Sequence, residues 1–331
     1  MQIRIIKPGL LSTIQDTGRL KYLAQAVPVS GTMDTLSARM ANMALGNEDT
    51  DAVIEFTYAK AAFKAETELL IAYSGDGAVL KSGDQVIPAD RPVYVPAGTV
   101  VQLVNNTIGS RTYLAVAGGW NVPTVLGSRS TYITAAIGGL NGRQLQTDDL
   151  LENHPKLTAT TQSILHSIAI GSQIQNANWA LTRLSILPAD RNTIRIIPGR
   201  EFTWFTSRSI IDFLTTPYSL TSQSNRMGYR LQGALLNRRI TSELLSTAVA
   251  PGTIQVTGGG ELILLMADCQ TTGGYPRIAQ VAAVDLPLCA QLKPDDPIYF
   301  KEISYEEADK LYIEQEQQLQ KISLAIKNKY I

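Results

Sequence analysis

The residues best suited to chemistry lie in one short segment, residues 270–277, which reads Gln-Thr-Thr-Gly-Gly-Tyr-Pro-Arg. Paired glycines allow backbone amides to converge on an anion, and the guanidinium group of Arg277 offers fixed donors that can complete such a clamp. A simple hairpin, which is the alternative, would not need Gln, Thr, Tyr and Arg together. We therefore interpret Arg277 as a catalytic anion donor. The substrate-binding positions predicted beside it are Gln270, Thr271, Thr272, Gly273, Gly274 and Tyr275.

Two motifs near the N-terminus offer further anion donors. A turn ends in Arg19, whose guanidinium group would either clamp a carboxylate or phosphate, or staple the turn through Asp16. Farther along, the backbone amides of Gly31 and Thr32 precede an expected helix, where such amides can hold a ligand oxygen. Asp34 explains the same polarity as a helix cap. We count Arg19 and Asp34 as catalytic candidates, and Gly31 and Thr32 as substrate-binding candidates.

Two other segments carry arginines in unusual places. Arg129 lies in a loop that either binds a ligand or forms a tight turn between strands. The hydroxyl groups around it cannot become nucleophiles, because no histidine that could act as a base is nearby in the sequence. Asn225 and Arg226 open a polar run inside a strand-like segment, residues 225–231, which is unusual for a mere edge strand. Arg129, Asn225 and Arg226 complete the predicted substrate-binding set.

Composition argues against several other classes of protein. The two histidines, His154 and His166, lie in a polar segment away from the glycine-rich motifs, so we expect surface histidines and neither a triad nor a metal site. Cys269 and Cys289 form no CxxC pair, and no GxxxxGKS loop is present. The net charge of +0 and the short longest apolar stretch, residues 262–267, predict no nucleic-acid or membrane partner. With no apolar leader segment, a reduced, cytoplasmic protein is expected.

Short β-rich runs separated by turn signals dominate the chain, which is typical of a barrel or a sandwich. The expected strands are residues 2–6, 52–56, 68–73, 92–95, 99–104 and 111–116, followed by 193–197, 252–257, 261–266, 278–284 and 297–300. Helices are expected at residues 34–45 and 201–213. A third helix is expected from Ser304, where Ser-Tyr-Glu-Glu forms a capping box.

The polar segment 151–192 is interpreted as the connection between two halves. Each half opens alike, with Arg-Ile-Ile at residues 4–6 and again at residues 195–197, which suggests two similar barrels in tandem. We expect a mainly β protein with two domains, residues 1–190 and 191–331, a few short helices and a C-terminal helix.

Taken in this order, the motifs resemble a carboxyltransferase-like family. It includes the C subunit of 5-oxoprolinase, the KipA proteins that antagonise the sporulation kinase inhibitor KipI, allophanate hydrolase subunit 2 and a carboxyltransferase domain of urea carboxylase. The matching stretches are residues 13–19, 30–34, 41–42, 46–47, 113–119, 127–131, 138–143, 225–231 and 270–277. The family more often has Ala at Thr32 and Asp at Asn225. The second change removes a charge beside Arg226, so we expect no ion pair between those neighbours.

The resemblance implies two cyclophilin-like β-barrel domains and a function within a complex. The implied reaction is the ATP-dependent opening of 5-oxoproline to glutamate together with an A subunit and a KipI-like B subunit, with ATP bound partly or wholly by a partner. Two alternatives stay open. One is the carboxyltransferase component of a biotin-dependent urea carboxylase-like system, with biotin on another chain. The other is a non-catalytic KipA-like regulator that binds a KipI-like inhibitor.

The expected active site lies where the 270–277 loop meets residues 31–34 and Arg19. A phosphorylated or carboxylated amide carries negative charge, and the histidines are too far away in sequence to offset it. Arginines, helix-start amides and paired glycines are the donors that remain.

Overall fold

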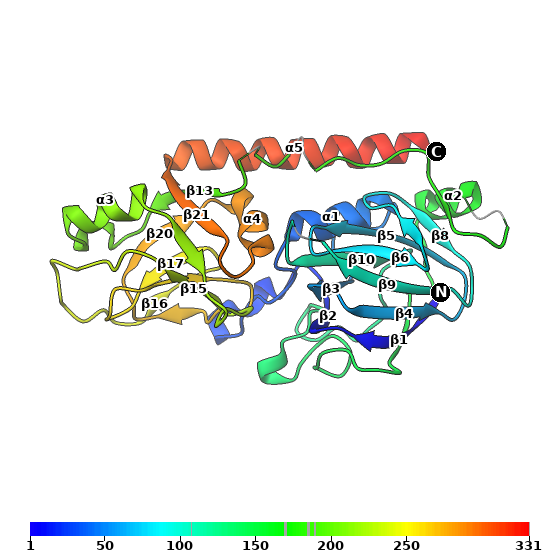
Figure 1. The fold of residues 1–331 in the computed structure, drawn as a ribbon, viewed down its shortest axis with the longest axis horizontal. Helices are drawn as coiled ribbons and strands as arrows, with labels where there is room; N and C mark the ends of the chain where they lie inside the picture. The colour runs from blue at the N-terminus through cyan, green and yellow to red at the C-terminus, as the bar shows by residue number, and fades with distance from the viewer. Residues whose placement is uncertain (107, 169–170, 184–185, 189, 331) are drawn as a thin grey trace. The chain divides into compact units, whose positions relative to one another are not determined.

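The computed structural model describes residues 1–106, 108–168, 171–183, 186–188 and 190–330 of the 331-residue chain. Strands dominate these residues and a long helix ends the chain (Figure 1), so the predicted mainly β class is confirmed. The chain divides into two compact units. The first unit contains Met1–Gly18, Ser30–Ile186 and the segment from Gln317 onward, and the second contains Arg19–Val29 and Leu187–Glu316.

Two six-stranded antiparallel sheets build the first unit. One has the strand order β11 (Leu150–Glu152), β1 (Gln2–Pro8), β4 (Ala61–Ala65), β9 (Val100–Asn105), β6 (Ala78–Ser82) and β7 (Gln85–Ile87). The other has the order β12 (Gln175–Asn176), β8 (Val93–Val95), β5 (Leu69–Gly75), β10 (Arg111–Val116), β3 (Val53–Thr57) and β2 (Leu11–Gln15). Side chains from both sheets, among them Ile3, Phe63, Ile54 and Leu114, share one hydrophobic core. The first unit is therefore built as two sheets around that core.

Burial differs between the two sheets for a physical reason. Strand β4 alternates buried and half-buried residues, because one face of its sheet meets the core and the other meets solvent. Strands β5 and β10 are buried at every position. Helix α1 (Thr35–Ala44) packs on these two strands and covers the second face of their sheet (Figure 1).

Helix α1 begins and ends where its sequence indicates. The Asp34 carboxylate accepts a hydrogen bond from the Ser37 backbone N–H at 2.8 Å, which is the expected N-cap. Gly46 follows the helix with a φ of 69°, a conformation that favours glycine. The first unit also contains α2 (Ala159–Ile168) and the short helix η2 (Ile133–Ala135).

A closed seven-stranded barrel forms the core of the second unit. Its order is β13 (Thr193–Pro198), β20 (Arg277–Val281), β17 (Thr253–Val256), β18 (Leu262–Leu265), β15 (Gly228–Gln232), β14 (Tyr218–Leu220) and β21 (Pro297–Glu302). The pair β13–β21 is parallel and closes the barrel, and the other pairs are antiparallel. Outside the barrel, β16 (Thr247–Ala248) and β19 (Thr272–Gly273) form a two-stranded ribbon. The short helices are η1 (Leu20–Gln25), η3 (Phe202–Trp204), α3 (Ser207–Thr215), η4 (Ala283–Asp285) and α4 (Leu286–Gln291).

The C-terminal helix α5 (Tyr305–Lys329) begins as predicted. The Glu307 backbone N–H donates to the Ser304 hydroxyl at 3.1 Å, as a capping serine requires. The helix is rich in polar residues. Among the described residues, no helix is both long enough and apolar enough to cross a membrane.

Every strand expected from the sequence overlaps a strand of the structure. The expected helix 201–213 is interrupted, because Phe205 is extended and Thr206 caps α3 by accepting from the Ser209 N–H. The expected connection 151–192 contains regular structure that was missed, namely part of β11, α2 and β12. The main division between the units falls between Ile186 and Leu187, close to the expected boundary after residue 190. Residues 19–29 belong to the second unit, and the segment from Gln317 onward belongs to the first. Residues 169–170, 184–185 and 189 of the connection lie outside the described residues.

One buried ion pair anchors the barrel at β13. The carboxylate of Asp285, which is fully buried, accepts hydrogen bonds from the backbone N–H and the guanidinium group of Arg195. Removing one partner of such a pair leaves the other without compensation. We expect Asp285→Ala to lower the free energy of unfolding by about 3 kcal/mol, measured by urea denaturation.

Asp309→Ala is the matched control, because Asp309 is an exposed acid on α5. We expect that variant to stay within about 0.5 kcal/mol of wild type. A similar small effect for Asp285→Ala would contradict the anchoring role.

Candidate functional site

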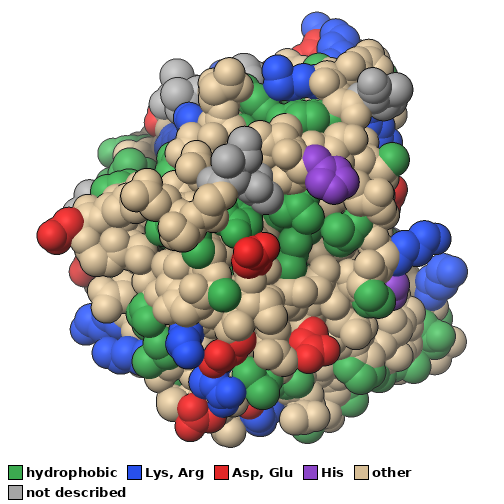
Figure 2. All heavy atoms as spheres, turned by 90° about the vertical axis from the view of Figure 1, so that its right-hand side faces the viewer, with side chains coloured by type: hydrophobic (Ala, Val, Ile, Leu, Met, Phe, Trp, Pro, Cys, Tyr) green, Lys and Arg blue, Asp and Glu red, His purple; other side chains and the backbone are tan. Residues whose placement is uncertain are grey.

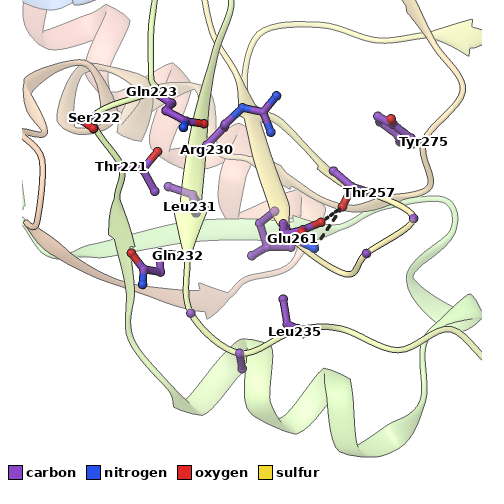
Figure 3. A pocket seen from close by; sticks show the side chains of 15 residues that line it. Thr221, Ser222, Gln223, Arg230, Leu231, Gln232, Leu235, Thr257, Glu261 and Tyr275 are labelled. Carbon is purple, nitrogen blue, oxygen red and sulfur yellow. Dashed lines mark hydrogen bonds between the residues drawn. The ribbon is translucent and has the colours of Figure 1, made fainter.

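A cavity of about 690 Å³ opens on the second unit and brings two predicted motifs together. Arg230 comes from the 225–231 segment and Tyr275 from the 270–277 loop, and both line it (Figure 3). The other polar side chains used below are Gln223, Gln232, Thr257 and Glu261. The cavity is large enough for a small organic ligand.

Arg230 reaches this cavity because of the strand period. Along β15 the side chains alternate, so Tyr229 and Leu231 are buried while Arg230 and Gln232 are exposed. Within the described part of the chain, the Arg230 guanidinium group has no hydrogen-bond or ion-pair partner. It is therefore available to a ligand carboxylate or phosphate, which a guanidinium group binds through two parallel hydrogen bonds.

Glu261 supplies the opposite charge in the same cavity. The Thr257 hydroxyl donates to its carboxylate (Figure 3). That hydrogen bond first, and the nearby Arg230 charge to a lesser degree, lower the pKa of Glu261. The cavity thus presents a guanidinium group, an ionised acid and several amide and hydroxyl groups.

Arg277 is held by a carboxylate of its own unit. Its guanidinium group donates to both oxygens of Glu201, at 2.7 Å each, and to the Ala248 carbonyl at 3.1 Å. Burial alone would raise the pKa of Glu201, but the hydrogen bonds from Arg277 outweigh it and the pKa is lowered. In this arrangement Arg277 binds the loop to the barrel, and a ligand anion would compete with Glu201 for it.

The first of the paired glycines, Gly273, allows the loop to approach the barrel closely. A Cβ on Gly273 would lie 2.5 Å from the Nε2 atom of Gln255, a buried side chain of β17. The same nitrogen donates to the Tyr275 carbonyl at 3.3 Å. Gly273 also belongs to the ribbon, where it pairs with Thr247. The loop is therefore shaped so that Tyr275 stands at the rim of the cavity, while Gln270, Thr272 and Gly274 are exposed beside it.

Asn225 and Arg226 serve the local backbone. The Asn225 side chain accepts from the Met227 N–H at 2.8 Å, which forms an Asx turn. Arg226 is buried and forms a two-pronged pair with Asp268 at 2.9 and 3.0 Å. Arg226 therefore has an acidic partner even though position 225 is Asn. The sequence alone did not reveal this partner, because Asp268 lies 42 residues away.

The predicted helix-start donors of the first unit have internal partners. The backbone N–H of Thr32 donates to the Asp16 carbonyl, that of Met33 to Glu55, and that of Asp34 to the Tyr113 hydroxyl. A ligand oxygen at this place would have to displace one of these acceptors. Gly31 has a φ of 87° and approaches the Asp16 carbonyl, where a Cβ would lie 3.1 Å away.

The loop that carries Arg129 is organised by the Asp16 carboxylate. Its two oxygens accept from the Ser128 and Ser130 hydroxyls at 2.5 and 2.6 Å and from the Arg129 backbone N–H at 2.6 Å. The Asp16 side chain therefore positions this loop, and it also accepts from the Gly18 backbone N–H at 2.9 Å within its own turn. The Arg129 side chain lines a second cavity in the first unit.

Arg19 lies in the part of the chain assigned to the second unit, where its backbone N–H donates to the Val29 carbonyl at 2.7 Å. Residues 31–34 belong to the first unit and the 270–277 loop to the second. Their convergence at one site remains a prediction.

No group of three or more His, Cys, Asp or Glu residues that could hold a metal ion occurs among the described residues. Burial raises the pKa of the Cys269 thiol to about 12, which leaves it unreactive. Figure 2 shows one face of the molecule, on which basic and acidic side chains are scattered without a continuous basic area.

Comparison with known proteins decides the family. Residues 25–302 match the family described as carboxyltransferase domain, subdomain A and B. The chain belongs to this carboxyltransferase-domain family. The resemblance expected from the motifs is confirmed.

Two relatives match the chain almost end to end. It is 36% identical to the C subunit of 5-oxoprolinase from Escherichia coli over 98% of this chain and 99% of that protein. It is 34% identical to the corresponding C subunit from Haemophilus influenzae over 91% of each chain. The crystal structure of the Kluyveromyces lactis urea amidolyase has the same fold, with a TM-score of 0.85 and 29% identity. That match covers 97% of this chain and 20% of the amidolyase.

Sequence reasoning missed several site residues of this carboxyltransferase-domain protein. Glu261 and Thr257 enclose three glycines and read as a plain turn, so nothing marked them as part of a cavity. Glu201 was placed in a helix, and its partner Arg277 lies 76 residues away. One signal in the sequence did point to this cavity, namely the polar run around Arg230. In a strand, Arg230 and its neighbour Tyr229 face opposite sides, so a buried Tyr229 leaves Arg230 outside the barrel.

Arg277 and Arg230 should respond differently to truncation. Arg277→Ala leaves Glu201 buried without its partner, so we expect the free energy of unfolding to fall by about 3 kcal/mol in urea denaturation. Arg230→Ala removes an exposed side chain that is unpaired within the described residues, and it should change the free energy of unfolding by less than about 0.5 kcal/mol.

The contribution of the Arg277–Glu201 pair should also depend on pH. The pKa of Glu201 is lowered on folding, so the stabilisation is present above the ordinary value of 4.5 and is lost as the pH falls through the lowered value. The stability difference between wild type and Arg277→Ala should therefore shrink on acidification. Equal stability of the two proteins at neutral pH would rule out this structural role.

Proposed function

We propose that this chain is the C subunit of an ATP-dependent 5-oxoprolinase, which opens 5-oxoproline to glutamate. The observation that carries the proposal is the match to the E. coli protein of that name, which extends over nearly the full length of both chains. On this proposal the enzyme is a hydrolase that acts on a cyclic amide, and this chain works with an A subunit and a KipI-like B subunit in the cytoplasm.

The chemistry explains why such a protein needs no nucleophilic triad. The lactam of 5-oxoproline is a stabilised amide that water opens slowly. Transfer of the γ-phosphoryl group of ATP to the amide oxygen makes the ring carbon electrophilic and releases ADP. Water then adds to that carbon, and the ring C–N bond breaks as the nitrogen takes up a proton, which leaves the side-chain carboxyl group as an acyl phosphate. A second water hydrolyses the acyl phosphate to the carboxylate and inorganic phosphate. Hydrogen-bond donors that stabilise the developing charge are what the protein must supply.

We place the 5-oxoproline site in the cavity of the second unit. Arg230, unpaired within the described residues, is suited to the substrate carboxylate. Gln223 and Gln232 carry amide groups that can both donate to and accept from a lactam. Tyr275 lies at the rim, and Figure 3 shows it set apart from the side chains of Gln223 and Arg230. The volume of about 690 Å³ accommodates a five-membered ring with space to spare.

The same cavity is poorly suited to a triphosphate. Its described lining contains one arginine, no lysine, and the ionised Glu261, which would repel phosphate oxygens. Residues 258–259 supply glycines, but no helix begins at these two described residues to add its N-terminal amides. We therefore assign ATP to a partner protein and give this chain the binding and orientation of the lactam.

The urea amidolyase structure supports a second candidate function, the carboxyltransferase component of a biotin-dependent system. An arginine and amide groups would also suit a carboxylated amide. In that case biotin would be carried by another chain, and urea or a similar amide would replace 5-oxoproline.

The proposal is tested by co-expressing this chain with its A and B subunits and measuring ADP release that depends on 5-oxoproline. We expect turnover by the complex and little or none by the isolated chain. Arg230→Ala should lower kcat/KM of the complex about tenfold to a hundredfold, because one charged contact to the substrate is lost.

Arg208→Ala is the control. Arg208 is an exposed arginine of α3 that pairs with Asp212 one turn later, and it does not line the cavity. A complex that assembles and releases no ADP with 5-oxoproline, but consumes carboxybiotin with urea, would replace the first function by the second. Unchanged kinetics of Arg230→Ala in an active complex would move the substrate site elsewhere.

A further inference from the structure

The first unit contains a second cavity, of about 280 Å³, that the proposed function does not use. Its lining combines side chains of both signs: Arg129, His154 and Lys156 with Glu48 and Asp51. The buried indole of Trp120 adds an apolar surface. Arg129 was predicted to bind substrate from the sequence, whereas His154 was expected to be an ordinary surface histidine.

The walls of this cavity are held in place by buried groups. The Asp16 carboxylate fixes the loop that carries Arg129, as described above. Asn47 accepts from the Gly118 N–H at 2.8 Å and donates to the Val116 carbonyl at 2.8 Å, which fixes the opposite wall. Asp16 binds only the backbone N–H of Arg129. The Arg129 guanidinium group has no hydrogen-bond or ion-pair partner among the described residues.

Two glycines allow the walls to approach each other. A Cβ on Gly118 would lie 2.7 Å from the His154 carbonyl, and one on Gly119 would lie 2.8 Å from the Asp51 Cβ atom. Both glycines have positive φ, at 83° and 72°. Side chains at these positions would force apart the segments that carry His154 and Asp51, so the glycines of the 117–119 motif are required by the cavity itself.

The charges of the lining are placed on separate segments. Asp51 accepts from the Glu48 N–H at 3.1 Å, and its pKa is raised because burial outweighs that hydrogen bond and the nearby Arg129 charge. On the other side, the Lys156 N–H donates to Nδ1 of His154 at 3.2 Å, so a neutral His154 carries its proton on Nε2. The cavity therefore offers cationic and N–H donors beside carboxylate acceptors.

We propose that this cavity binds a small α-amino acid through both of its charged groups. The ligand carboxylate would pair with Arg129 and Lys156, and the ligand ammonium with Asp51 and Glu48. A simple anion would be repelled by the two carboxylates, and a simple cation would be repelled by Arg129 and Lys156. For either ion, this repulsion offsets the attraction to the groups of opposite charge. The volume is at the lower limit for ligand pockets, which excludes a nucleotide.

The charge pattern distinguishes two compounds of the proposed reaction. 5-Oxoproline has a carboxylate, but its nitrogen is a neutral lactam nitrogen. L-Glutamate has a free ammonium group, so the cavity should select glutamate. The choice of L-glutamate as first probe rests on the proposed function, whereas the preference for a zwitterion rests on the cavity alone.

The test measures binding to the full-length purified chain by calorimetry, with L-glutamate, L-alanine, 5-oxoproline and acetate as probes. We expect at least one of the two amino acids to bind about tenfold more tightly than 5-oxoproline and acetate. Arg129→Gln and Asp51→Asn should each weaken that binding about tenfold, with an unchanged melting temperature as evidence of folding.

Lys7→Gln is the matched control, because it removes one positive charge from an exposed site in the same unit. It should leave the affinity as in wild type. Equal affinity for acetate and for the amino acids would overturn the proposal, as would no binding of either amino acid at about 10 mM. Because the isolated chain is used, failure here is distinct from failure of 5-oxoproline turnover by the complex.

Discussion

The burial of arginine is the constraint on which the rest of this protein depends. A guanidinium group that leaves water must meet a carboxylate, because an unpaired buried charge is costly by several kcal/mol. Pairs that satisfy this rule within the two units include Arg277 with Glu201, Arg226 with Asp268, Arg195 with Asp285, Arg183 with Asp76 and Arg111 with Glu55. Each ties a loop or a strand end to its neighbours. Among the described residues, the arginines left for ligands are therefore those that line cavities without a partner, Arg230 and Arg129.

Buried polar side chains also determine how the polar loops are shaped. Asp16 collects three donors from the loop of Arg129, and Gln255 supports the loop of Tyr275. Such loops lie close to the sheets beneath them, and glycine at positions 118 and 273 is what permits the approach. The sequence suggested that these glycines expose amides to an anion, but in the structure their role is in packing. They bring backbone segments together, and the side chains at the rim are left to meet the ligand.

Local signals account for the parts of the fold that the sequence predicts. Apolar runs between turn residues mark the strands, and Asp34 with Gly46 marks the limits of α1. Strand β4 was missed because Ala-Ala-Phe-Lys-Ala has little strand propensity, and its pairing with β1 and β9 is what makes it a strand. The site was harder to predict. Glu201 and Arg277 are far apart in sequence. From sequence alone, an arginine that binds a ligand cannot be told from one that pairs with a distant carboxylate of the same protein.

The distribution of free charge supports a division of labour between the proteins of such a complex. Phosphoryl transfer requires several positive groups around the phosphates, usually with a metal ion. The described lining of the cavity in the second unit has a single arginine, and an ionised glutamate lies beside it. The cavity of the first unit has more cations but is too small for a nucleotide and includes two acids. Cavities lined in this way are suited to small carboxylates and amides, which agrees with the proposal that a partner protein binds ATP.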